Sequence, residues 1–208
     1  NASNTATPLV TITFTAKENI NGTATITLKD LEMTKSGSET SDKAVVEKAL
    51  TVTLHDIRVT LTAGNGTIND STESVILYAK YNASGLYSDA ARKTAASVNV
   101  SANEGYRLNN KQDEKLWLCG ETGYASFDAI KGLTFTENKT FALQTTKVWT
   151  ISFNADGVTG GSLSSTDAIP VDDGTKLSAA GLPTATPDTG YTFTGWKSGD
   201  SIVDLNST

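Results

Sequence analysis

The octapeptide Thr189-Gly190-Tyr191-Thr192-Phe193-Thr194-Gly195-Trp196 lies near the carboxyl end of this 208-residue chain. Its Gly–Tyr step predicts a tight turn, because glycine reaches positive φ angles without a steric penalty. The alternation of aromatic and threonine residues after the turn predicts a β-strand with one apolar face. We therefore expect Gly190 to make the turn. The aromatic side chains expected in the core of this module are Tyr191, Phe193 and Trp196.

The same skeleton occurs twice in the chain, which indicates an internal repeat. An alternating segment followed by a glycine turn is found at residues 57–66 and again at residues 148–161. Further along, the sequence Glu104-Gly105-Tyr106-Arg107-Leu108 corresponds to the octapeptide, and a tryptophan follows in both copies. The expected repeat-core residues of the first copy are Gly105, Tyr106 and Trp117.

The second copy, residues 148–208, resembles the Listeria-Bacteroides repeat, the β-grasp-like module of internalin B and many Gram-positive surface proteins. The resemblance rests on the strand at residues 150–155, the stretch Leu182-Pro183-Thr184 and the octapeptide. It implies a small β-grasp-like fold. Members of this family end with a further strand pair after the tryptophan, and this chain ends at Thr208. We therefore expect the second module to stop before its last strand.

The remainder of the chain is expected to form two further parts. Residues 55–147 form a first β-grasp-like repeat with a longer middle, in which residues 86–96 are the best helix candidate and residues 133–136 a strand. Residues 1–54 resemble the closing strands of a cohesin-like β-sandwich, because alternating segments occur at residues 9–17, 22–28 and 50–54. The predicted fold class is all-β with minor α, consisting of partial β-sandwich strands followed by two tandem β-grasp-like repeats.

Trp149 is the exception among the repeat aromatics, because its counterpart in the first copy is the charged residue Arg58. The alternation of the strand places it on one face with Ile151 and Phe153. We predict that Trp149 is a ligand or partner contact.

Composition excludes several classes of protein. The net charge is −6, and only 19% of residues are charged, so the basic face needed for nucleic acid or an anionic membrane is missing. No apolar run approaches the ~18 residues of a membrane span. One cysteine, Cys119, and one histidine, His55, cannot build a disulfide framework or a zinc site within one chain. The acidic stretch Asp172-Asp173-Gly174 lacks the spacing of an EF-hand and predicts a turn.

These observations predict a chain with no catalytic residue, no cofactor and no metal. The resemblance implies a secreted or cell-surface, non-catalytic structural or adhesive module of a bacterial surface protein, whose partners are other protein chains or host or plant surface glycans. One alternative is a subunit of an extracellular fibre that self-associates by β-strand donation at unpaired sheet edges. Another is a carbohydrate-binding or cellulosome-scaffold module that uses Trp149.

Overall fold

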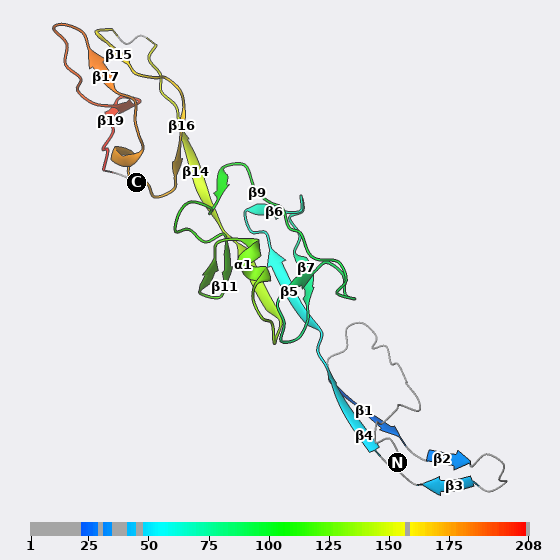
Figure 1. Cartoon of the computed structure of the whole chain (residues 1–208). Helices are drawn as coiled ribbons and strands as arrows, with labels where there is room; N and C mark the ends of the chain where they lie inside the picture. The colour runs from blue at the N-terminus through cyan, green and yellow to red at the C-terminus, as the bar shows by residue number, and fades with distance from the viewer. Residues whose placement is uncertain (1–21, 29–30, 35–40, 45–47, 157–158, 207–208) are drawn as a thin grey trace, which may run out of the picture. The chain divides into compact units, whose positions relative to one another are not determined.

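The computed structural model describes residues 22–28, 31–34, 41–44, 48–156 and 159–206. Short strands dominate this part of the chain, beside one short α-helix and one 3-10 turn (Figure 1). The fold is therefore all-β with a minor α contribution, and this prediction is confirmed. The chain divides into two compact units by its internal contacts.

Unit 1 comprises Asn1–Val59, Ile76–Ser97 and Lys131–Lys139. β1 and β4 form an antiparallel two-stranded ribbon in which Gly22 is opposite Leu54, and β2 and β3 form a second antiparallel pair. The alternating segments predicted at residues 22–28 and 50–54 are thus strands that pair with each other. The segment at residues 9–17 lies outside the described residues, and the cohesin-like sandwich stays a prediction. The strands of this unit are β1 (Gly22–Leu28), β2 (Leu31–Thr34), β3 (Ser41–Ala44), β4 (Lys48–Leu54) and β8 (Leu86–Tyr87).

A buried carboxylate lies in unit 1 where β4 leads into the next strand. Asp56 is only 7% exposed, and its two oxygens accept hydrogen bonds from Arg58 Nε at 2.9 Å and Arg92 Nη2 at 2.8 Å. Burial alone would raise the pKa of Asp56, but the hydrogen bonds from the two guanidinium groups hold it below its usual range. Arg92 Nε also donates to the carbonyl oxygen of Ala79, which ties this loop to a strand.

The helix predicted at residues 86–96 is wrong. β8 occupies only Leu86–Tyr87, and the chain then turns. The carboxylate of Asp89 accepts hydrogen bonds from the backbone N–H groups of Lys93 and Thr94, and Arg92 has a φ of 56°. This local side-chain bonding competes with a helix, and a positive φ interrupts one.

The strand predicted at residues 133–136 is also wrong, because Phe135 makes only isolated bridges with Tyr81 and Ala83. The described α-helix is α1 (Phe127–Lys131), where Ser126 Oγ accepts a hydrogen bond from the backbone N–H of Ala129. An N-terminal cap of this kind satisfies a donor that a helix leaves free.

Unit 2 comprises Thr60–Val75, Val98–Ile130 and Thr140–Thr208. β6 pairs with β9, β15 with β17 and β18 with β19, each antiparallel. Its elements are β6 (Gly66–Ile68), β9 (Val100–Ala102), β10 (Tyr106–Leu108), β11 (Trp117–Cys119), β12 (Thr122–Tyr124), β14 (Thr145–Ile151), β15 (Gly161–Leu163), β16 (Ile169–Asp172), the 3-10 turn η1 (Leu177–Ala179), β17 (Ala185–Pro187), β18 (Lys197–Ser198) and β19 (Ser201–Ile202).

The largest sheet has the strand order β12-β11-β13-β5-β7-β8. Along β5 buried and half-buried side chains alternate, as its sequence pattern predicts for a strand with one face in a core. Some elements begin in one unit and end in the other. They are the strands β5 (Ile57–Thr62), β7 (Val75–Ala79) and β13 (Lys139–Leu143) and the helix α1.

The core of unit 2 is built around Trp117 and Phe141, which are 0% and 1% exposed. The ring of Phe141 meets that of Tyr124 edge-on, with 5.4 Å between the ring centroids. The other buried apolar side chains of this unit are Leu61, Ala63, Ile68, Ile130, Leu143 and Val171.

β14 is the middle strand of a three-stranded antiparallel sheet with the order β10-β14-β16. Its first half pairs with β10, where Tyr106 is opposite Lys147, and its second half pairs with β16, where Trp149 is opposite Val171. β14 therefore runs through the predicted boundary between residues 147 and 148. One strand joins the two predicted repeats by backbone hydrogen bonding.

Candidate functional site

A network of four charged side chains lies where the two predicted repeats meet. Arg107, on β10, donates from Nε and Nη2 to the two carboxylate oxygens of Asp172 on β16, both at 2.7 Å. The same guanidinium donates to Glu114 from Nη1 at 2.8 Å and from Nη2 at 2.6 Å. Lys111 Nζ lies 2.6 Å from Asp172 Oδ2. Every oxygen of the two carboxylates thus receives a charge-assisted hydrogen bond, which is the stronger kind.

The protonation equilibria of this cluster follow from its geometry. Hydrogen bonding to Arg107 lowers the pKa of Glu114 to about 2, and hydrogen bonds from Arg107 and then Lys111 lower the pKa of Asp172 well below its usual range. The two carboxylates in turn raise the pKa of Arg107. Arg107, Glu114 and Asp172 are therefore charged near neutral pH, and the cluster is suited to holding strands together rather than to proton transfer.

The sequence does not single out this cluster. Arg107 appears there only as a position inside a repeat motif, and Asp172 as part of an acidic turn. The turn itself is present, because Thr175 N donates to the carbonyl oxygen of Asp172 at 3.0 Å and Gly174 has a φ of 77°. One signal in the sequence could have pointed to the cluster. Arg107 is a charged residue in the strand of the repeat motif, and its neighbours Tyr106 and Leu108 are uncharged.

Trp149 lies on β14 beside this cluster and is 52% exposed. Its indole Nε1 donates to Asp173 Oδ1 at 2.6 Å, and the ammonium group of Lys147 lies 3.7 Å from the ring centroid. A cation held over the ring in this way covers one of its two faces. The proposed ligand-contact role of Trp149 stays a prediction, and a stacking ligand would have to use the face away from Lys147.

The two Gly–Tyr turns of the repeat motif have the same local geometry. Gly105 and Gly190 have φ angles of 76° and 85°. Tyr106 N donates to the carbonyl oxygen of Asn103, and Tyr191 N donates to that of Asp188, both at 3.0 Å. Each turn therefore places a glycine in the left-handed region, which glycine occupies at the lowest cost.

After these turns the two copies differ. Tyr106 begins β10 and is half-buried, and Trp117 is fully buried. Residues 191–196 form no strand, and Tyr191 and Phe193 are 58% and 46% exposed. The expectation that these two side chains lie in a core is therefore wrong. Trp196 is half-buried between Phe153 and Phe193, at centroid distances of 5.3 and 5.6 Å.

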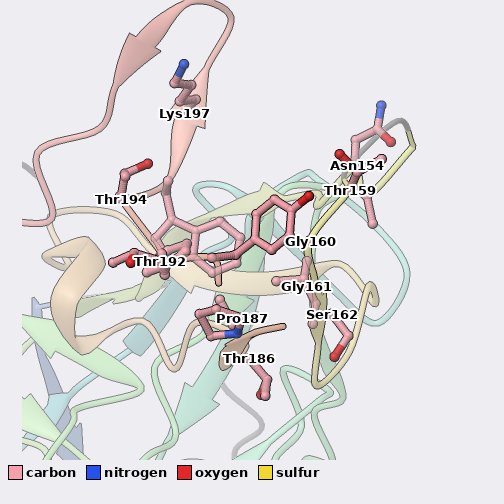
Figure 2. Close-up of a pocket in the computed structure, with 17 residues that line it drawn as sticks. Asn154, Thr159, Gly160, Gly161, Ser162, Thr186, Pro187, Thr192, Thr194 and Lys197 are labelled. Carbon is pink, nitrogen blue, oxygen red and sulfur yellow. The ribbon is translucent and has the colours of Figure 1, made fainter. Parts of the chain in front are cut away.

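The exposed aromatic residues open onto a cavity of about 370 Å³, here called the aromatic pocket (Figure 2). It is lined by residues 154–155, 159–163, 185–187 and 191–197, which include the strands β15 and β17. Gly160 lies directly under the ring of Tyr191, because a Cβ atom at that position would lie 2.2 Å from Tyr191 Cδ1. The absence of a side chain at Gly160 is what allows the ring to lie there.

The remaining singled-out residues do not form a reactive centre. His55 stacks on Tyr81 with 3.6 Å between ring centroids and an interplanar angle of 7°. Cys119 is a free, half-buried thiol. Within the described part of the chain, no group of three or more His, Cys, Asp or Glu side chains is placed to hold a metal ion, and no helix is long and apolar enough to cross a membrane.

Comparison with known proteins bears on the second repeat. No curated protein and no solved structure matches the chain. Residues 149–208 match the family model of a divergent InlB B-repeat domain, which coincides with the module predicted at residues 148–208 and includes the whole octapeptide. This part of the chain is thus similar to an InlB-type repeat, a similarity that points to a repeat module of a bacterial surface protein.

Proposed function

We propose that the chain is a non-catalytic structural segment of a bacterial surface protein, in which two successive β modules are joined so that they resist separation. The observation that carries this proposal is the bidentate pairing of Arg107 with Asp172 across the shared strand β14. Support for the surface location comes from the match of residues 149–208 to a divergent InlB B-repeat domain.

The connection between the two modules, here called the joint, consists of the strand β14 with its two neighbouring strands and of the pair Arg107–Asp172. These two components act in parallel. Backbone hydrogen bonds tie β14 to β10 on one side and to β16 on the other. Arg107 then links those two outer strands directly, because it reaches Asp172 at the end of β16 from its place on β10. Separating the modules therefore requires breaking the ladders and the charge-assisted bonds together.

The geometry also accounts for why the cluster is charged rather than apolar. Small β modules have limited cores of their own and depend on contacts with neighbouring modules. A bidentate arginine–carboxylate pair is directional, so it stabilises one register of β10, β14 and β16 over others. An ion-pair joint thus adds geometric specificity that a patch of apolar contact would not.

The experiment uses tryptophan fluorescence to follow the two modules separately. One variant keeps only Trp117, in the first predicted repeat, and another keeps only Trp196, in the second, with the other tryptophans changed to Phe. If the modules are joined, the fluorescence midpoint of each variant coincides with the circular-dichroism midpoint of that same variant, and adding Arg107→Met makes the two midpoints diverge. The matched control is Glu137→Gln, which removes an exposed ion pair with Lys139 elsewhere in the chain.

Two outcomes would contradict the proposal. The first is a fluorescence midpoint that differs from the circular-dichroism midpoint of the same variant before Arg107 is changed. The second is an unchanged common midpoint in the Arg107→Met variant, which would show that the charged cluster does not join the modules. A direct mechanical measurement follows from the same logic: pulling the chain from its ends should require a lower force for unit 2 in Arg107→Met than in the unmodified chain.

A further inference from the structure

We propose that the aromatic pocket binds a neutral saccharide. The pocket belongs to the part of the chain that matches the InlB-type repeat, and its proposed role is independent of the joint at Arg107. At about 370 Å³ its volume lies toward the lower end of the ~300–1,000 Å³ that small-molecule sites usually occupy. A short saccharide matches this size better than a long or branched ligand does.

The rings that open onto the pocket supply stacking surfaces. Tyr191 and Phe193 are both about half exposed, although aromatic side chains of this size are normally buried when a module provides a core for them. The edge-on contact with Trp196, at a centroid distance of 5.6 Å, holds the Phe193 ring in a defined orientation. The apolar C–H faces of a sugar ring are the natural partners of such flat, electron-rich surfaces.

Glycine residues in the wall allow neighbouring parts of the pocket to lie directly against the backbone. Gly160 and Gly161 follow one another at the start of β15, and both lie within the pocket wall (Figure 2). A side chain at Gly160 would collide with the ring of Tyr191, and one at Gly161 would lie 2.9 Å from the carbonyl oxygen of Thr186. The position of the Tyr191 ring therefore depends on the absence of a side chain at Gly160. The shape of the pocket depends on how closely the backbone approaches its neighbours at both glycines.

The polar groups of the wall distinguish a saccharide from other ligands. Hydroxyl groups are contributed by residues of several segments, namely Thr159, Ser162, Thr186, Thr192 and Thr194. Among the described residues that line the pocket, none carries a carboxylate, and Lys197 is the one cation. A cationic ligand would find no counter-charge, and a purely apolar ligand would leave hydroxyl groups without partners. A neutral molecule rich in hydroxyl groups satisfies both conditions.

The test begins with the whole chain on an array of neutral, sialylated and sulfated oligosaccharides, with the neutral disaccharides cellobiose, lactose and N,N′-diacetylchitobiose then titrated by tryptophan fluorescence. We expect binding to neutral members of the array. Tyr191→Ala and Phe193→Ala should each weaken that binding at least about tenfold, as loss of a stacked ring does. Tyr81→Ala is the matched control, since it removes an exposed aromatic ring outside the pocket, and should leave the affinity unchanged.

A conservative variant keeps the test valid where loss of an aromatic ring disturbs folding. Thr192→Val preserves the shape of an exposed side chain and removes its hydroxyl, and it should weaken binding by about two- to tenfold. Circular dichroism and the thermal midpoint confirm that each variant is folded.

Four results would overturn the proposal. The first is binding to no neutral saccharide on the array. The second is binding that is restricted to sialylated or sulfated glycans and is lost in Lys197→Ala, which would show that the site prefers anionic ligands. The third is loss of binding in Trp149→Ala with Tyr191→Ala unaffected, which would move the site to β14. The fourth is concentration-dependent self-association that Tyr191→Ala abolishes, because a second copy of the chain would then cover these rings.

Discussion

Arg107 and Asp172 are 65 positions apart in the sequence, yet two parallel hydrogen bonds of 2.7 Å join the guanidinium of one to the carboxylate of the other. The pair spans the three-stranded sheet from β10 to β16 and involves both predicted repeats. Because the side chains are only partly exposed, the bonds are less screened by water than a surface ion pair would be. The stability of the joint should therefore depend on this single guanidinium.

Replacing Arg107 by methionine keeps the aliphatic packing and leaves Asp172 and Glu114 without their main donor. We expect a loss of about 1–3 kcal/mol in the free energy of unfolding, since hydrogen bonds to charged groups contribute amounts of this order. Urea denaturation followed by far-ultraviolet circular dichroism measures it. The control Glu137→Gln should leave the free energy of unfolding nearly unchanged, because exposed ion pairs contribute little. Equal losses in the two variants would contradict a special role for Arg107.

The contribution of Arg107 should also depend on pH. The carboxyl pKa values of Glu114 and Asp172 are lowered in the folded chain from ordinary values of 4.5 and 3.8, to about 2 for Glu114. Stabilisation by groups of this kind is present above their unfolded pKa values and is lost as the pH falls through the folded ones. The gap in urea midpoint between the original chain and Arg107→Met should thus be largest near neutral pH, begin to narrow below about pH 4.5 and go on narrowing as the pH falls through about 2. A gap that stays constant across this range would argue against the ion pairs as its source.

Truncation of Trp117 should cost much more stability than truncation of Trp149. Trp117→Ala empties a site that is 0% exposed and should cost about 3–5 kcal/mol. Trp117→Phe should cost clearly less, because its buried Nε1 has no hydrogen-bond partner among the described residues and removing it forfeits no bond. Trp149→Ala loses one hydrogen bond and one cation–ring contact at an exposed position, so about 1 kcal/mol is expected. Thermal or chemical unfolding of the three variants ranks these costs, and an equal cost for Trp117→Ala and Trp149→Ala would be incompatible with the structure.

Gly160→Ala tests the packing of Tyr191 on the backbone. Both Gly160 and Gly174 have positive φ angles, 91° and 77°, so alanine is strained at either position. A Cβ atom meets nothing within 4 Å at Gly174 but lies 2.2 Å from the Tyr191 ring at Gly160. Gly160→Ala should therefore cost about 1–2 kcal/mol more than Gly174→Ala. The ring proton resonances of Tyr191 should shift in the first variant and stay in place in the second, and unshifted resonances in Gly160→Ala would contradict the contact.

Local features of the fold were predictable from the sequence, because each depends on neighbouring residues. Alternation at residues 22–28 and 50–54 predicts strands, and both occur. The glycines at positions 105 and 190 precede tyrosines in matching contexts, and both adopt the positive φ that such turns need. The helix predicted at residues 86–96 failed for a reason equally local, since Asp89 offers the backbone of Lys93 and Thr94 a bonding pattern that propensity alone does not show.

The candidate sites depend on which segments meet in space, and periodicity does not specify that. Alternation groups Tyr191 with Phe193 on one face, but whether another element covers the face is decided by packing, and in this fold both rings stay exposed. In the sequence, Arg107 is one residue of a repeat motif and Asp172 is one residue of a turn. The register of β10, β14 and β16 brings their side chains to a hydrogen-bond distance of 2.7 Å. The chain's own sequence thus determined its all-β character and its glycine turns through short-range sterics, whereas the joint and the aromatic pocket were decided by tertiary contacts between residues far apart in the chain.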